Sequence, residues 1–229
     1  MPKPTPLLMT VDVVALSVRP DDGLCALAVR RGSEPHKGRW ALPGGFVDKD
    51  EPLDKAAARE LGEETGVSPR SLELHQVGAY GAPKRDPRGR VVSLAWLTAL
   101  PASTEVAGGD DATDARWFPV ADLLKPRKLA FDHATILKDA LALAGRELED
   151  SSFGTRFLPR AFTVSDLREV YEAVWEQELD AGNFQRKVTG VPGLLKPTGR
   201  TVQRGRGRPA ALYTAGSATT ISPPLTRVG

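Results

Sequence analysis

The chain of 229 residues lacks several features that common protein classes require. Its single cysteine, Cys25, excludes an internal disulfide, and the surrounding apolar run predicts that this thiol is buried. Its histidines, His36, His75 and His133, show none of the spacings of a zinc site, and we assign them no role. No basic, apolar and cleavable segment opens the chain, and the first apolar run is broken by Asp12 and is too short to cross a bilayer. We therefore expect a cytoplasmic protein with no membrane partner.

Carboxylates are instead concentrated in one segment, between Gly45 and Val67. Glu60, Glu63 and Glu64 follow the i, i+3, i+4 spacing that places side chains on one face of a helix. Carboxylates held this close repel one another unless a cation neutralises them, and hard divalent cations such as Mg²⁺ and Mn²⁺ take oxygen ligands. The alternative is that these glutamates belong to a solvated helix face. That alternative is favoured for any single surface glutamate, whereas the whole set at this spacing favours a binding face.

The residues around the glutamates support a binding face. Pro52 suits the first position of a helix, and Glu51 before it would complement the positive end of the helix dipole. Arg59 is predicted to hold Glu51 or a neighbouring carboxylate in position with its forked guanidinium. Gly44 and Gly45 would let the backbone approach a metal or a phosphate closely.

This segment resembles the pattern that defines the Nudix hydrolases, Gly-x5-Glu-x7-Arg-Glu-aliphatic-x-Glu-Glu-x-Gly-aliphatic, and no defining position departs from it. The matching residues are Gly45, Glu51, Arg59, Glu60, Leu61, Glu63, Glu64, Gly66 and Val67. The resemblance implies an α/β/α sandwich in which metal-activated water attacks a nucleoside diphosphate linked to another moiety. It implies catalytic roles for Glu51, Arg59, Glu60, Glu63 and Glu64, and a Mg²⁺ or Mn²⁺ site formed by Gly45, Glu60, Glu63 and Glu64. A purely sensory site would need no metal.

Residues outside the pattern give weaker indications of a nucleotide pocket. Arg30 and Arg31 end a strand-like run, and Arg39 and Trp40 precede Gly44. Guanidinium groups and an aromatic face suit phosphates and a base. We take Arg30, Arg39, Trp40 and Gly44 as candidate ligand-binding residues, with ordinary surface charge and a core tryptophan as the alternative.

Charge and apolar patterning divide the chain into two domains. Residues 1–155 carry 20 basic and 23 acidic residues, whereas residues 156–229 carry 11 basic and 6 acidic ones. Apolar runs at 9–18, 24–30, 72–80, 90–100 and 115–119 predict strands of a mixed sheet, covered by a helix over 132–149. We assign residues 1–150 to this first domain and 151–161 to a linker. Residues 162–214 follow the order helix, turn, helix and hairpin, and the small, polar residues 215–229 predict a disordered tail. The predicted fold class is α+β, a Nudix sandwich with a C-terminal winged helix-turn-helix domain.

The second domain carries the side chains that a DNA-binding helix needs. Its second predicted helix, from residue 183 to about 189, offers polar and cationic groups beside two core positions; they are Asn183, Gln185, Arg186 and Lys187. The following Arg204, Arg206 and Arg208 alternate with glycines and resemble the core of an AT-hook, which suits a narrow minor groove. A protein-interaction module is the alternative, because Arg/Gly loops also occur for solubility alone.

Taken together, residues 9–214 resemble the Nudix-related transcriptional regulators of NAD metabolism. The resemblance rests also on the segments 129–133, 158–159, 162–163, 170–172, 183–184, 207–210 and 212–213. It implies a homodimer whose winged helices hold a palindromic DNA operator until ADP-ribose or a related NAD metabolite binds the Nudix domain. Three hypotheses follow. The protein is a ligand-controlled DNA-binding regulator, it is a Mg²⁺-dependent ADP-ribose pyrophosphatase, or it is a regulator that slowly hydrolyses its own effector.

Overall fold

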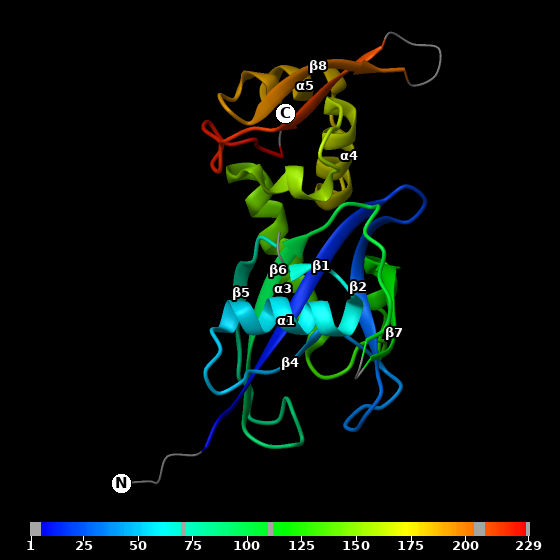
Figure 1. The fold of residues 1–229 in the computed structure, drawn as a ribbon, viewed down its shortest axis with the longest axis vertical. Helices are drawn as coiled ribbons and strands as arrows, with labels where there is room; N and C mark the ends of the chain where they lie inside the picture. Colours follow the sequence, from blue (N-terminus) through cyan, green and yellow to red (C-terminus); the bar gives the residue numbers. More distant parts are fainter. Residues whose placement is uncertain (1–5, 70–71, 110–111, 204–208, 228–229) are drawn as a thin grey trace. The chain divides into compact units, whose positions relative to one another are not determined.

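The fold was analysed in a computed structural model that describes residues 6–69, 72–109, 112–203 and 209–227 (Figure 1). The contacts divide the chain into two compact units. The first comprises residues 1–16, 25–98 and 104–140, and the second comprises residues 17–24, 99–103 and 141–229. Among the described residues, no helix combines the length and the apolar character that crossing a membrane requires.

A seven-stranded sheet organises the first unit, with the order β3-β2-β1-β6-β5 and with β4 and β7 paired to β1 and β2. The strands are β1 (Leu8–Arg19), β2 (Gly23–Arg31), β3 (Trp40–Ala41), β4 (Gly44–Phe46), β5 (His75–Tyr80), β6 (Val91–Ala99) and β7 (Ala112–Pro119). The prediction missed β3 and β4, which are too short to show an apolar pattern. β4 runs antiparallel to β1 and places Gly44 opposite Asp12, so the segment that enters the acidic helix is fixed to the centre of the sheet.

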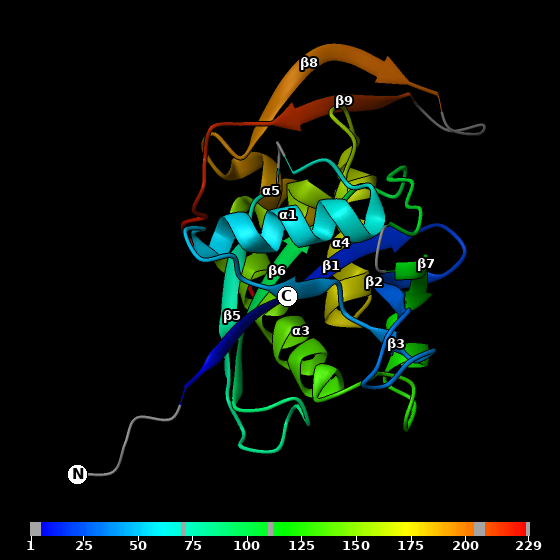
Figure 2. The same cartoon turned by 60° about the horizontal axis from the view of Figure 1, so that its bottom comes forward.

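Helices cover both faces of this sheet. Helix α1 (Leu53–Thr65) lies on one face, and the first part of α3 (His133–Asp150) lies on the other, while α2 (Val120–Leu123) is a single turn (Figures 1 and 2). The core is formed by strand residues such as Val13 and Leu27 together with Leu61 of α1 and Ile136 of α3, all fully buried. These layers form the predicted α/β/α sandwich.

Helix α1 is amphipathic, as the sequence predicted. Ala56, Ala57 and Leu61 are buried, and the helix ends at Gly66, whose φ of 73° is the left-handed conformation that glycine adopts without strain. Its start differs from the prediction, because Pro52 is extended and Leu53 is the first helical residue. No side chain caps this end, so the carboxylate before the proline is free to bind elsewhere.

The second unit contains the predicted order of helix, helix and hairpin. It includes α4 (Val164–Trp175), α5 (Ala181–Gly190), β8 (Leu195–Val202) and β9 (Ala210–Ala215), with the two strands paired antiparallel. Thr163 and Asp166 form a capping box at the start of α4. Phe184 and Val188 of α5 are buried, and the ring of Phe184 lies 5.1 Å from that of Tyr171 of α4.

Two segments are more ordered than the sequence suggested. Within the predicted linker, Ser152–Phe157 forms the 3₁₀ helix η2, and both of its phenylalanines are buried. The predicted disordered tail is wrong for residues 216–227. Ile221 and Leu225 are buried, and their backbone N–H groups donate to carbonyls at the end of α3, from Ile221 to Asp150 and from Leu225 to Glu149. These two apolar side chains anchor the C-terminal segment to the second unit. The average composition of the segment is polar and does not reveal them.

Candidate functional site

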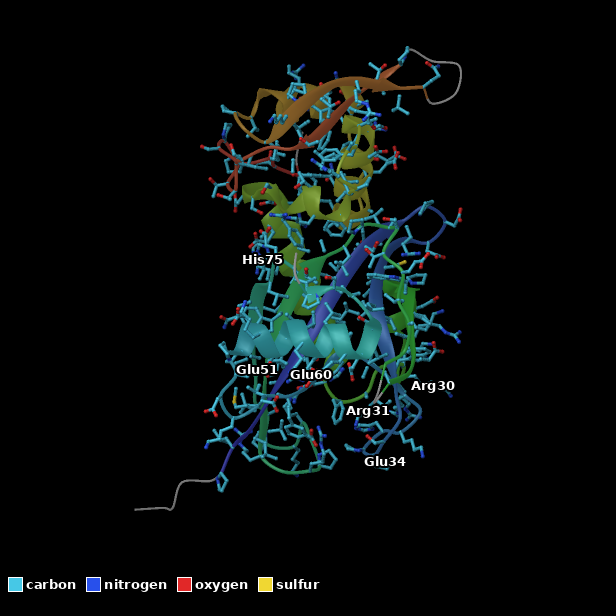
Figure 3. All side chains as sticks on the ribbon, viewed as in Figure 1. Arg30, Arg31, Glu34, Glu51, Glu60 and His75 are labelled. Carbon is cyan, nitrogen blue, oxygen red and sulfur yellow. The ribbon has the colours of Figure 1, made fainter. Side chains whose placement is uncertain are left out.

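A cavity of about 340 Å³ in the first unit brings the acidic helix together with cationic and aromatic side chains. Its acidic lining comprises Asp12, Asp48, Glu60, Glu64 and Asp86, and its basic lining comprises Arg30, Arg31, Arg59, Arg85 and Arg88. Its aromatic lining comprises Phe46, Phe131 and His133. Figure 3 shows Glu51 and Glu60 below α1, and Arg30 and Arg31 near the end of β2. The cavity can therefore contact both the anionic groups of a ligand and a cation bound with it.

Arg59 is the organising cation of the acidic face, as predicted. Its guanidinium donates two hydrogen bonds of 2.9 Å to the carboxylate of Glu51 and one of 2.9 Å each to Glu60 and Glu63. It also donates to the carbonyl of Phe46 at 3.2 Å. The hydrogen bond with Arg59 holds the pKa of Glu51 below its ordinary value. Arg59 thus ties the loop that precedes α1 to the exposed face of the helix.

Glu60 and Glu64 occupy a less solvated position than the other glutamates. Glu64 accepts a hydrogen bond of 2.9 Å from the backbone N–H of Gly44, yet burial raises its pKa to about 8. Burial likewise raises the pKa of Glu60. The carboxylate of Glu60 lies flat against Gly45, where a Cβ would come within 2.4 Å of Oε1. A glycine is therefore required at this position for Glu60 to keep its place.

The donor set fits a hard divalent cation in its chemistry. Glu60 and Glu64 are carboxylates that burial deprives of hydration. A cation bound to them would stabilise their ionised form in place of water. In the part of the chain that the structure describes, no three acidic or histidine side chains already converge as a formed metal site. Glu63 is half-exposed and is held by Arg59. A bound metal would have to draw Glu63 away from that guanidinium.

A cationic and aromatic wall lines another part of the cavity. The guanidinium carbon of Arg31 lies 4.9 Å from the ring centre of Phe131, and that of Arg88 lies 5.8 Å from the same ring. Arg88 also lies 4.7 Å from the ring centre of Phe46, which is 41% exposed. Such stacking suits planar groups and anions together. We use the name cationic wall for Arg31, Arg88, Phe46 and Phe131.

Beneath this wall is a network of buried charges. Arg85 binds Asp132 through Nε at 2.9 Å and Nη2 at 2.7 Å, and Nη2 lies 3.4 Å from Oδ2 of Asp12. Asp12 also accepts from the hydroxyl of Ser93 at 2.5 Å. His133 accepts the backbone N–H of Leu42 at Nδ1, which leaves Nε2 facing Asp12 at 3.4 Å. Burial lowers the pKa of His133, so its imidazole is neutral and carries its proton on Nε2.

The predicted ligand-binding residues divide into two pairs. Arg30 and Gly44 line the cavity, whereas Arg39 and Trp40 do not. The Trp40 ring packs edge-to-face on Phe118 at 4.6 Å, as expected for a packing role in place of ligand binding. Arg39 is exposed, and its backbone pairs with Arg31 and His36 in the turn between β2 and β3.

Sequence reasoning missed most of the cationic wall and the buried network. His133 was assigned no role, yet it lines the cavity, is only 4% exposed, and lies 5.3 Å from Phe131 between ring centres. Arg85 and Arg88 come from the loop between β5 and β6, far along the chain from the acidic helix. No spacing rule joins these positions, since only the sheet order brings the segments together.

The predicted DNA-binding residues are on α5 of the second unit. Gln185 and Arg186 are exposed, and Asn183 and Lys187 are partly exposed. Arg186 donates to the side-chain oxygen of Asn183 at 2.8 Å. Asp180 caps the helix by accepting the backbone N–H of Asn183 at 2.7 Å. The other predicted residues, Arg204, Arg206 and Arg208, lie outside the described residues.

The fold and the acidic site together define a Nudix domain joined to a winged helix, and family comparisons agree. The NUDIX domain family matches residues 8–140, and the NrtR DNA-binding winged helix domain family matches residues 154–215. The chain belongs to the Nudix family and carries the winged helix domain of the NrtR proteins.

Some individual relatives match across both domains, and another matches about half of the chain. The chain is 34% identical over 213 residues to the ADPR responsive transcriptional repressor NtrR of Acinetobacter baylyi, covering 92% of this chain and 82% of that protein. It is similar to the crystal structure of Shewanella oneidensis NrtR complexed with a 27mer DNA, with a TM-score of 0.81, 30% identity, and 95% and 99% of the two chains covered. The ADP-ribose pyrophosphatase of Methanocaldococcus jannaschii is 44% identical over 113 residues, or 49% of this chain and 63% of that protein.

Proposed function

We propose that the protein is a DNA-binding transcriptional repressor of NAD biosynthesis or salvage genes that responds to ADP-ribose or a related NAD metabolite. The observation that carries the proposal is that one chain combines a cavity lined by acidic and basic side chains with an NrtR winged helix, and that 92% of it aligns with an ADPR responsive repressor. A diphosphate-containing nucleotide matches the cavity because its anionic centre needs cations and its sugar and base ends need polar and aromatic surfaces.

In this proposal α5 is the recognition helix. Its side chains Gln185 and Arg186 are exposed while Phe184 and Val188 anchor the helix in the core, so the polar face is free to enter a major groove. A homodimer would place two such helices on a palindromic operator, and ligand binding in the Nudix domain would shift the protein away from the DNA-bound state. The repressor would act in the cytoplasm, on chromosomal DNA.

The test is a titration of the full chain with a fluorescent palindromic duplex taken from the promoter of an NAD-synthesis gene. We expect specific binding at physiological salt, and release when ADP-ribose is added. Replacing Arg186 by Ala should weaken binding and lower the slope of log K against log salt by about one if it contacts a phosphate. Replacing exposed Arg146 of α3 provides a matched loss of charge outside the helix-turn-helix and its hairpin. Binding that stays sequence-independent, or that ADP-ribose does not change, would refute the proposal.

A second function is supported by the complete Nudix pattern and by the similarity to an ADP-ribose pyrophosphatase. Glu60, Glu63, Glu64 and the carbonyl of Gly45 would hold Mg²⁺ or Mn²⁺, with Glu51 and Arg59 keeping the acidic face in position. When bound, the metal supplies charge neutralisation at the phosphoryl oxygens and a more acidic water. A slow hydrolysis would let the regulator clear its own effector after responding to it.

The hydrolase function is tested by incubating the protein with ADP-ribose and Mg²⁺ and measuring AMP and ribose 5-phosphate. Glu63→Gln should abolish turnover, while exposed Glu105→Gln should not change it. Turnover that Glu63→Gln leaves intact would contradict the assignment. A protein that releases DNA on ADP-ribose binding without turnover would be a sensor alone.

A further inference from the structure

The cationic wall contains a positive charge that the described residues do not neutralise by an ion pair. Arg31 is partly buried in the cavity, its Nε donates to the carbonyl of Pro35 at 2.7 Å, and its guanidinium stacks on Phe131. No carboxylate among the described residues lies within ion-pair distance of it. By contrast, Arg59, Arg85 and Arg88 of the same cavity each bind a carboxylate.

A half-desolvated cation without a counter-ion is unfavourable unless a ligand supplies the anion. Burial and the nearby charge of Arg88 lower the pKa of Arg31, and the carboxylates of Glu64, Asp86 and Asp12 oppose this only in part, although a guanidinium stays charged. The cavity is therefore built to receive negative charge beside Arg31.

Arg88 is held ready for the same anion. Its guanidinium binds Asp86 through Nε at 3.1 Å and Nη2 at 2.7 Å, and the backbone N–H of Arg88 donates to Asp86 at 2.9 Å. The Asp86 side chain is only 1% exposed, so it fixes the orientation of Arg88 from inside the protein. A guanidinium has five N–H donors, and this pair uses one edge of the fork.

Phe131 is the ring that both guanidinium groups contact. It is a non-glycine residue with a φ of 48°, and such a conformation persists at a cavity only where the surroundings enforce it. Its ring packs on His36 at 4.7 Å and on His133 at 5.3 Å, which fixes the ring that Arg31 and Arg88 contact. The position of the ring that both cations contact is thus set by a buried histidine and by the strained backbone of Phe131.

We propose that Arg31 and Arg88 form a phosphate-binding pair that takes the diphosphate of the ligand, with Asp86 as the positioning residue of Arg88, so that the ligand binds without a divalent cation. This inference rests on the proposed nucleotide-sensing function and deepens it. The diphosphate of such a ligand would neutralise the charge of Arg31 and accept hydrogen bonds from the donors of Arg88 that Asp86 leaves free. Divalent metal at the glutamates then serves hydrolysis and is dispensable for sensing.

The experiment is isothermal titration calorimetry of the full chain with two probes, ADP-ribose and inorganic pyrophosphate, in excess EDTA and in Mg²⁺. We expect both probes to bind in EDTA. Arg31→Gln and Arg88→Gln should each weaken binding roughly 10- to 100-fold, the range for losing a hydrogen bond to a charged group. Arg116→Gln is the matched control, because this guanidinium is 65% exposed and lies outside the cavity lining.

Two further variants separate positioning from folding. Asp86→Asn should weaken ADP-ribose binding, and combining it with Arg88→Gln should cause little additional loss because both changes act through one guanidinium. Arg31→Lys keeps the charge and should recover part of the affinity that Arg31→Gln loses. Thermal unfolding of each variant shows whether it is folded. If Asp86→Asn does not fold, the comparison of Arg31→Lys with Arg31→Gln still decides the test.

Each outcome is informative. Binding that EDTA abolishes, or Arg31 and Arg88 variants that bind as tightly as the wild type, would overturn the inference while leaving the ligand-sensing function standing. Pyrophosphate binding that depends on Arg31 and Arg88, without any binding of ADP-ribose, would support the pair and refute the proposed effector. Absence of binding by either probe would overturn both.

Discussion

Glu64 offers the sharpest test of the site, because its carboxylate is buried among other acidic groups. Replacing it by Gln keeps the size of the side chain and an oxygen that can accept the N–H of Gly44, but it removes the ionisation. Burial, opposed only in part by that hydrogen bond, raises the pKa of Glu64 to about 8. The metal-free wild type should therefore lose stability as the carboxyl ionises, and Glu64→Gln should not.

The direction follows from proton linkage. An unfolded chain releases the proton of a glutamate near pH 4.5, whereas the folded protein retains it until the pH approaches 8. Between these values the folded state binds more protons, so the free energy of unfolding falls by about 1.4 kcal/mol per pH unit. Over the whole interval the loss is on the order of 4 to 5 kcal/mol, and it is complete above pH 8.

The assay is urea unfolding in EDTA at intervals from pH 4.5 to 8.5, comparing the wild type with Glu64→Gln. The two should be similarly stable at pH 4.5, and the variant should be more stable at pH 8.5. Glu105→Gln, which removes an exposed carboxylate of the same unit, should follow the wild type. Parallel pH profiles for the wild type and Glu64→Gln would refute the reasoning, because the carboxylate would then be solvated in the folded protein.

Three further outcomes are expected from unfolding measurements. Gly109→Ala should destabilise the first unit by roughly 2 kcal/mol or more, because the added Cβ would lie 1.6 Å from the backbone oxygen of Glu63. Gly78→Ala is the control and should be nearly neutral, because its Cβ would meet nothing closer than 3.9 Å. Glu176→Gly should stabilise the second unit by about 0.5–1 kcal/mol, because this residue closes α4 with a φ of 53°; destabilisation would contradict this. Ile221→Ala should cost about 2–4 kcal/mol, and an unchanged midpoint would show that the C-terminal segment does not contribute to the core.

Much of the site's acidic half could be predicted from sequence because local rules govern it. The i, i+3, i+4 spacing in α1 fixes which glutamates share a face, and the proximity of Arg59 to them follows from the same helix. The strands β1 and β2 and the helices α3 to α5 were also predictable from apolar periodicity, since each is long enough to show it.

The cationic half was not predictable, because it depends on contacts between distant segments. Arg31, Arg88 and Phe131 meet only after the sheet has ordered β2, the loop before β6 and the loop before α3. Short elements were lost for a related reason, since two or three residues cannot show a period. The C-terminal segment was misjudged because two buried anchors decide its state and the average polarity of its neighbours does not.

The docked C-terminal segment also bears on where the DNA-binding part of the chain can be separated. The winged helix family match ends at residue 215, but Ile221 and Leu225 are buried beyond that point and pair their backbone with Asp150 and Glu149. A fragment cut at the end of the match would leave an apolar surface bare and prone to association. A fragment meant to report on DNA affinity should extend through residue 227 and begin early enough to retain the last turns of α3.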